Sequence, residues 1–123
     1  MVQECRKISF SMDEVRSALE RYQTIAPDFM PEGPAVRCSV LTYGGISVIA
    51  GKDGSFAQKK YVLTGAELLK PMIGFCIDHK IMLPREAQKA IEFQKDTVVL
   101  RIDFTFTVNF IVAAIHPSPT QST

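Results

Sequence analysis

The chain has 123 residues, of which 46% are hydrophobic and 22% are charged, and its formal net charge is +1. This composition is typical of a globular protein that buries a core, and the length predicts one domain. The small net charge gives no electrostatic reason to expect binding to nucleic acid, an anionic membrane or an acidic substrate.

The cysteines and the apolar runs indicate the cellular compartment. Cys5, Cys38 and Cys76 are an odd number at wide spacings, which argues against a disulfide framework and favours a reducing cytoplasm. Charges near the N-terminus argue against a secretory signal, and the apolar segment at residues 104–115 is too short to span a membrane. We therefore expect a cytoplasmic protein.

The first expected elements are a short strand at residues 6–10 and a helix. Ser11 and Glu14 have the S-x-x-E spacing of a capping box, which marks a helix start. Apolar residues then recur on one helical face, and Pro27 ends the helix because the residue before a proline avoids helical geometry. Residues 27–34, with three prolines, are expected to form a loop.

Three strands of an antiparallel meander are expected next, at residues 35–43, 46–50 and 56–63. Gly44-Gly45 separates the first two strands, and Asp53-Gly54 separates the last two. Both pairs are typical of two-residue hairpin turns.

Thr64 and Glu67 repeat the capping-box spacing and predict a second helix. Pro71 is expected to kink this helix or delay its start, and Gly74 weakens it. The apolar stripe is broad, which indicates a helix largely enclosed against a sheet. Its members are Leu68, Leu69, Met72, Ile73, Cys76 and Ile77.

Residues 84–94 allow two interpretations. Pro84 suits the first position of a helical turn that reaches Ala90. Alternatively, residues 91–94 form a strand that pairs, through a turn at Lys95-Asp96, with the final strand.

The final strand has the clearest pattern. Every even-numbered position in residues 98–114 is apolar, whereas the odd positions in the middle are polar, which predicts one buried and one wetted face. At ~3.3 Å per residue this segment would span roughly 55 Å, whereas a domain of this size is roughly 35 Å across. The strand must therefore bend, fray or pair with another copy. Residues 116–123 are expected to be a disordered tail after a domain of residues 1–115.

These elements predict an α+β fold. We expect an antiparallel sheet of about five strands with the two main helices packed on one face, in the order β-α-β-β-β-α-(α or β)-β.

Residues 78–102 join the apolar end of the second helix, a Leu-Pro-Arg segment, an Ala-Gln-Lys-Ala-Ile-Glu segment and the start of the last strand. This arrangement resembles a group of small uncharacterised bacterial proteins, over residues 6–103. The resemblance implies a single cytoplasmic α+β domain, with no catalytic residues to transfer.

Cys76 and His79 are the candidates for chemistry. Their spacing on a helix would let a thiolate meet an imidazolium, as in a nucleophile or half of a zinc site. However, Cys76 falls in the apolar stripe, His79 lies where a helix end favours a cation, and no second Cys/His pair completes a site. We therefore expect no catalytic residue, cofactor or metal.

The leading functional hypothesis is a non-enzymatic interaction or scaffold domain that forms a homodimer. Its contact face would comprise Phe104, Phe106, Val108, Phe110 and Val112. One alternative is a protein that binds an unidentified small ligand between the second helix and the sheet, near Tyr61, Cys76 and His79. Another is an accessory protein that binds nucleic acid.

Overall fold

The computed structural model describes residues 2–31, 33–51 and 58–106. Its elements, in order, are β1 (Val2–Phe10), α1 (Met12–Ile25), β2 (Ala35–Val40), β3 (Ile46–Ala50), β4 (Lys59–Leu63), α2 (Gly65–Asp78), β5 (Gln88–Gln94) and β6 (Thr97–Phe106). The predicted α+β class and antiparallel pairing are confirmed. At residues 88–94 the structure has a strand, which decides between the two interpretations of that region.

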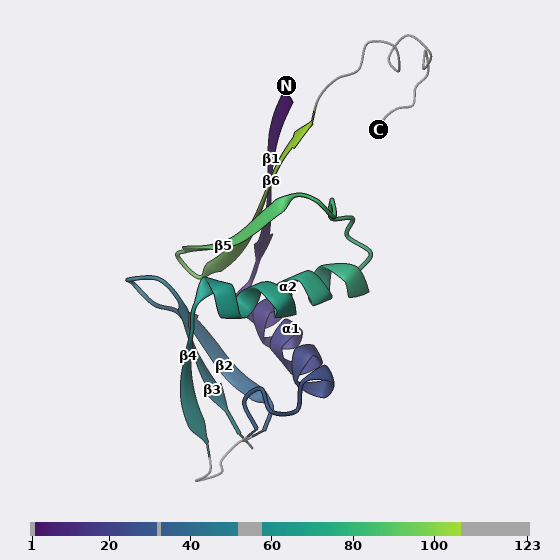
Figure 1. Cartoon of the computed structure of the whole chain (residues 1–123). Coiled ribbons are helices and arrows are strands. Elements are labelled where there is room, and N and C mark those ends of the chain that lie inside the picture. The colour runs from purple at the N-terminus through teal and green to yellow at the C-terminus, as the bar shows by residue number, and fades with distance from the viewer. Residues whose placement is uncertain (1, 32, 52–57, 107–123) are drawn as a thin grey trace.

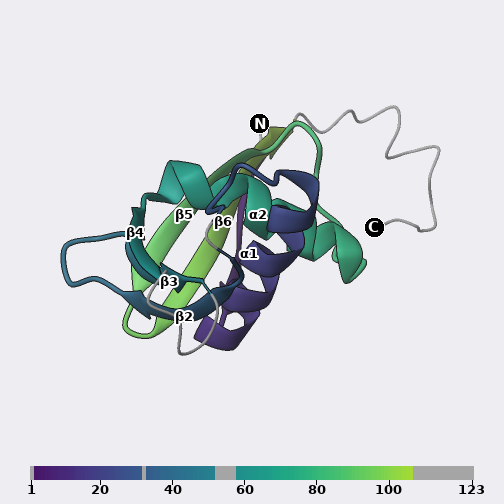
Figure 2. The same ribbon diagram turned by 90° about the horizontal axis from the view of Figure 1, so that it is seen from below.

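The strands divide between two three-stranded sheets, with orders β1-β6-β5 and β2-β3-β4, rather than sharing one. The second sheet is a local meander, whereas the first joins the two ends of the described chain. Helix α1 packs against α2 and β2, and α2 packs against β5. Figure 1 shows the β1–β6 pair extending beyond the helices, away from the β2-β3-β4 sheet, and Figure 2 shows the same elements from below.

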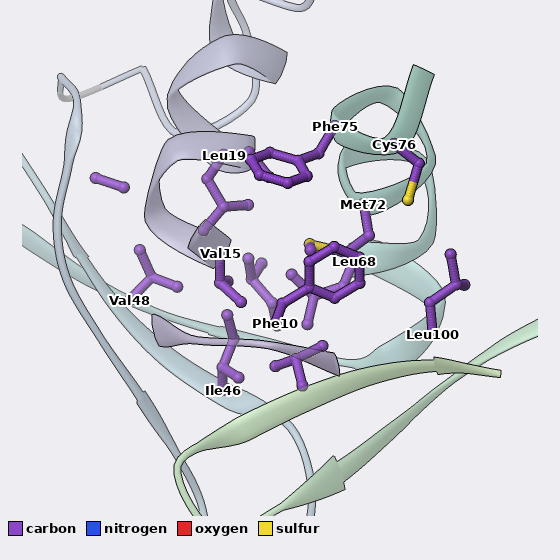
Figure 3. Close-up of a cluster of buried hydrophobic side chains, with 14 of the residues drawn as sticks. Phe10, Val15, Leu19, Ile46, Val48, Leu68, Met72, Phe75, Cys76 and Leu100 are labelled. Carbon is purple, nitrogen blue, oxygen red and sulfur yellow. The ribbon is translucent and has the colours of Figure 1, made fainter. Parts of the chain in front are cut away.

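The core lies where both helices meet both sheets (Figure 3). Its fully buried side chains include Val15 and Leu19 of α1, Ile46 and Val48 of β3, Leu68 and Met72 of α2, and Leu100 of β6. Complete burial of such a side chain stabilises the fold by about 1.5–3 kcal/mol. On the even-numbered face of β6, Val98, Leu100 and Ile102 are buried as the alternation predicts, and Phe104 is half-buried.

Both predicted capping boxes form. The Ser11 hydroxyl accepts from the Glu14 amide at 3.2 Å, and the Glu14 carboxylate accepts from the Ser11 amide at 2.9 Å. Thr64 and Glu67 make the same pair of bonds at 3.3 and 2.9 Å. These reciprocal bonds satisfy amides that have no partner within the helix.

Helix α2 begins at Gly65 in spite of Pro71, so of the two effects expected of the proline, a kink or a delayed start, the delayed start does not occur. The proline ring is buried and belongs to the face that packs on the core. Gly74 has a packing role, because a Cβ there would lie 2.5 Å from the Arg21 guanidinium of α1. Arg21 also pairs with Asp78 and so bridges the two helices.

The hairpin between β2 and β3 differs from the prediction. Strand β2 ends at Val40, and the Leu41 amide donates to the Gly45 carbonyl at 3.0 Å, so residues 42–44 form the turn. Gly44, at φ +97°, closes this three-residue loop. The predicted Asp53-Gly54 turn lies outside the described residues.

The two long strands also depart from their predicted bounds. Strand β1 begins at Val2 instead of residue 6, because its backbone pairs with β6 along its whole length. Strand β6 is described as far as Phe106. The rest of the predicted final strand and the predicted tail lie outside the described residues.

Candidate functional site

The part of the β1–β6 pair that leaves the core is the candidate interaction surface. We define the outer ribbon as residues 2–6 of β1 and residues 102–106 of β6, which pair in register from Val2 with Phe106 to Arg6 with Ile102. The β1 side chains of the outer ribbon are exposed, and burial begins only at Ile8. In Figure 1 the outer ribbon projects past α2.

The outer edge of β1 pairs with no other strand among the described residues, and the positions of its outward backbone groups follow from the β5–β6 turn. Gln94 and Thr97 flank the two-residue turn Lys95-Asp96, so they bond each other as the first and fourth residues of a β-turn. Along an antiparallel ladder, residues that share hydrogen bonds with the neighbouring strand alternate with residues that do not. Thr97 bonds to β5, so the other odd-numbered residues of β6 also bond to β5, and the even-numbered residues bond to β1. The even residues of β1 therefore bond to β6. The N–H and C=O groups that point outward belong to Gln3, Cys5, Lys7 and Ser9.

An ionic network crosses the face of the β1-β6-β5 sheet that carries these odd-numbered side chains. Lys7 Nζ lies 3.4 Å from Glu92 Oε1, and Arg101 Nη1 lies 3.2 Å from Glu92 Oε2. Arg101 Nε donates to Asp103 Oδ2 at 2.8 Å. Val99, on the same face, is only 1% exposed. The network ties the three strands together across this face.

The charges in this network hold one another ionised. The hydrogen bond from Arg101, and then that from Lys7, lowers the pKa of Glu92. The pKa of Asp103 is lowered first by a hydrogen bond from the Cys5 thiol and then by Arg101. The pKa of Arg101 is raised by Glu92 and Asp103.

A hollow of about 670 Å³ opens over the outer ribbon. Its lining combines acidic, basic and thiol groups from β1, β6, β5 and the segment before β5. These residues are Gln3, Glu4, Cys5, Glu86, Gln88, Arg101, Asp103, Phe104 and Thr105. Three carboxylates against one guanidinium make it a poor receptor for an anion. In the described ranges, no group of three His, Cys, Asp or Glu side chains could hold a metal ion.

Cys76 and His79, the candidates for chemistry, face different surroundings. The Cys76 side chain is completely buried in the core (Figure 3), and burial raises the pKa of its thiol. His79 is the exposed C-cap of α2, where its ring stacks on Phe75 at 4.0 Å and its Nδ1 lies 2.9 Å from the Phe75 carbonyl oxygen. These positions agree with structural roles for both residues.

Tyr61, the third residue of the predicted ligand pocket, belongs to β4 and thus to the β2-β3-β4 sheet. The Lys59 ammonium lies 5.1 Å from the centre of its ring. The hollow beside His79, of about 380 Å³, lies between the start of α1 and the end of α2. It is lined by Asp13, Glu14, Ser17, Phe75, His79 and Ile81.

The predicted self-association face is described only at its beginning. Phe104 is half-buried and packs against the core cluster, and the backbone of Phe106 ends β6. Val108, Phe110 and Val112 lie outside the described residues. Sequence reasoning missed the outer half of β1, because its pairing partner lies at the other end of the chain and its own residues show no strand alternation.

Comparisons of the chain with protein-family models, with curated proteins and with solved structures found no match. No helix in the part of the chain that the structure describes is long and apolar enough to cross a membrane. Function is therefore inferred from the chain's own residues.

Proposed function

We propose that this chain is a non-enzymatic interaction domain that self-associates as a homodimer through the β1–β6 pair. The observation that carries the proposal is the position of β1 at the edge of its sheet. Within the described ranges β1 pairs only with β6, so its other edge presents a row of N–H and C=O groups. Such a row is a template for another strand.

Strand β1 lacks two of the devices that normally protect an edge strand, a bulge and a proline, although it carries charged side chains at Glu4, Arg6 and Lys7. Its nine residues pair with β6 in unbroken register and include no proline. The ammonium of Lys7, its one lysine, is drawn across the sheet toward Glu92. A long and regular edge of this kind favours pairing with a second strand.

The sequence from Phe106 onward supports the same proposal. Phe106, Val108, Phe110 and Val112 continue the apolar alternation of β6. Apolar side chains in this number are unfavourable in water and are normally covered by other protein surface. A two-fold contact between copies covers equivalent surfaces on both chains at once.

The experiment is light scattering across micromolar concentrations, with a mass above the 13.7 kDa of one chain as the expected result. Gln3→Pro removes an outward N–H of β1 while leaving the β1–β6 bonds in place, and should weaken association. Gln3→Ala keeps that N–H and should associate as the natural chain does. A mass of 13.7 kDa at every concentration would contradict the proposal.

The two alternatives have less support. A ligand pocket between α2 and the sheet would need a path to Cys76, whose side chain is fully buried. Nucleic-acid binding would need a basic surface, which the net charge of +1 does not supply.

A further inference from the structure

Resting on the proposed self-association, we infer that two copies pair β1 with β1 in antiparallel orientation, about a two-fold axis at Cys5. The two β1-β6-β5 sheets then join into one continuous sheet of six strands. The inference follows from the direction of the edge hydrogen bonds and from the charges along β1.

The edge hydrogen bonds restrict the register. Only odd-numbered residues of β1 direct N–H and C=O groups outward, so each hydrogen-bonded pair across the seam must join two odd-numbered residues. The two-fold axis therefore passes beside one residue of β1, and each choice of that residue defines one register.

An axis at Cys5 brings complementary side chains together. Glu4 of each copy then lies opposite Arg6 of the other, which places two opposite-charge pairs across the seam. Val2 lies opposite Ile8, and Gln3 lies opposite Lys7. Opposite charges and apolar pairs directly across two strands stabilise their pairing.

The other registers are less favourable. An axis at Glu4 places Glu4 opposite itself, and an axis at Arg6 places two guanidinium groups together, both of which destabilise a strand pair. An axis at Gln3 shortens the described seam to residues 2–4. An axis at Lys7 places two lysines together and draws the buried Phe10 into the seam.

Arg6 already has one partner within its own chain, on the face of the sheet that carries the buried Phe10. Arg6 Nη1 donates to the Met82 carbonyl at 2.8 Å, so its guanidinium is anchored between β1 and the segment that precedes β5. Met82 is 81% exposed and Val2 is 36% exposed. Val2 is an apolar side chain within the proposed seam.

Charge exchange tests the register. Glu4→Arg replaces both attractive pairs by repulsive ones and should weaken dimerisation roughly tenfold, as expected for two cross-strand pairs that change sign. Adding Arg6→Glu to the same chain restores opposite charges and should recover the affinity to within a few-fold. Light scattering measures the dimer, and circular dichroism checks that each variant is folded.

Two further measurements use the same surface. Mixing the single variants Glu4→Arg and Arg6→Glu should produce heterodimers, because each chain then carries charges of one sign at both positions.

Cα atoms of directly opposite residues in a hydrogen-bonded pair are about 5.5 Å apart, so a short bismaleimide should join the exposed Cys5 thiols. Cys5→Ser should abolish this cross-link and keep the dimer.

The outcomes separate the inference from the proposal on which it rests. A chain that stays monomeric overturns both. A dimer that is indifferent to Glu4→Arg and is not cross-linked through Cys5 overturns the register and leaves self-association standing. Weakening by Glu4→Arg, recovery by the double exchange and cross-linking through Cys5 support the register.

Discussion

Two side-chain hydroxyls hold the beginnings of the helices. Because the Ser11 hydroxyl accepts a bond from the Glu14 amide, Ser11→Ala leaves that amide without its partner. We expect the free energy of unfolding to fall by about 1 kcal/mol, measured by urea denaturation. Ser11→Asp keeps an acceptor and should retain most of the stability. An unchanged midpoint for the alanine variant would show that the cap contributes nothing.

The three cysteines differ in accessibility, so a thiol reagent should label them in a fixed order. Cys5 is exposed, whereas burial raises the pKa of the half-buried Cys38 to about 11 and also raises the pKa of the buried Cys76. The thiolate is the reactive form, so Cys5 should label first, Cys38 slowly, and Cys76 only on unfolding. Mass spectrometry of the native protein at mildly alkaline pH measures this order.

Rapid labelling of Cys76 in the native protein, slowed by His79→Ala, would reveal an accessible thiol–imidazole pair. It would thereby reopen the case for catalysis. Cys76→Ala should lower stability modestly, because the thiol acts as a small core hydrophobe.

For single residues, the sequence predicted the features that depend on residues close together in the chain. The capping boxes depend on residues three apart, and the burial of Cys76 follows from its apolar stripe. The role of Gly45 could not be predicted. A Cβ at that position would lie 2.9 Å from the carbonyl oxygen of Leu63, which belongs to a different strand.

Among the elements, the contact between α1 and α2 depends on Gly74. An alanine in a helix interior is roughly 1 kcal/mol more favourable than glycine, but its Cβ would displace the Arg21 guanidinium from its place beside Asp78. We therefore expect Gly74→Ala to stabilise the Arg21→Ala variant more than it stabilises the natural chain. A double-mutant cycle of unfolding free energies measures the difference. Equal effects in both backgrounds would show that the glycine is not needed for this contact.

The network on the β1-β6-β5 sheet makes stability depend on pH. The folded-state pKa values of Glu92 and Asp103 lie below their ordinary values of 4.5 and 3.8. Their stabilising contribution is therefore complete above these values and is lost as the pH falls through the lower folded values. Urea denaturation below pH 5 should show this loss, and Arg101→Gln should make it shallower. An identical slope for the variant would contradict the assignment.

Elements with local signals were predicted well, and those that depend on distant partners were not. Helix α1 and strand β3 match their predicted bounds because caps, proline and alternation mark them. The strand at β5 became certain only through its pairing with β6. The turn at residues 42–44 was missed, because two adjacent glycines resemble a two-residue turn even when only the first of them lies within the loop.

For the whole molecule, the sequence predicted the class and the order of elements but not the division into two sheets. Hairpin signals specify which consecutive strands pair, as in β2-β3-β4, and carry no information about the partner of β1. The outer ribbon, and with it the candidate interaction surface, exists only because β1 pairs with β6. The ionic network likewise depends on Lys7, Glu92 and Arg101 meeting across three strands.

The pairing of Val2 with Phe106 also has a consequence for the order of events during biosynthesis. Strand β1 leaves the ribosome before the other described elements, yet its partner β6 is the last of them to be translated. Contacts between residues so far apart in sequence form slowly, because the chain loses the entropy of closing a long loop before the contacts stabilise it. The meander of β2, β3 and β4 has only short loops to close and can assemble early. Until translation reaches β6, both edges of β1 are open, and the nascent chain is then most exposed to misassembly with its neighbours.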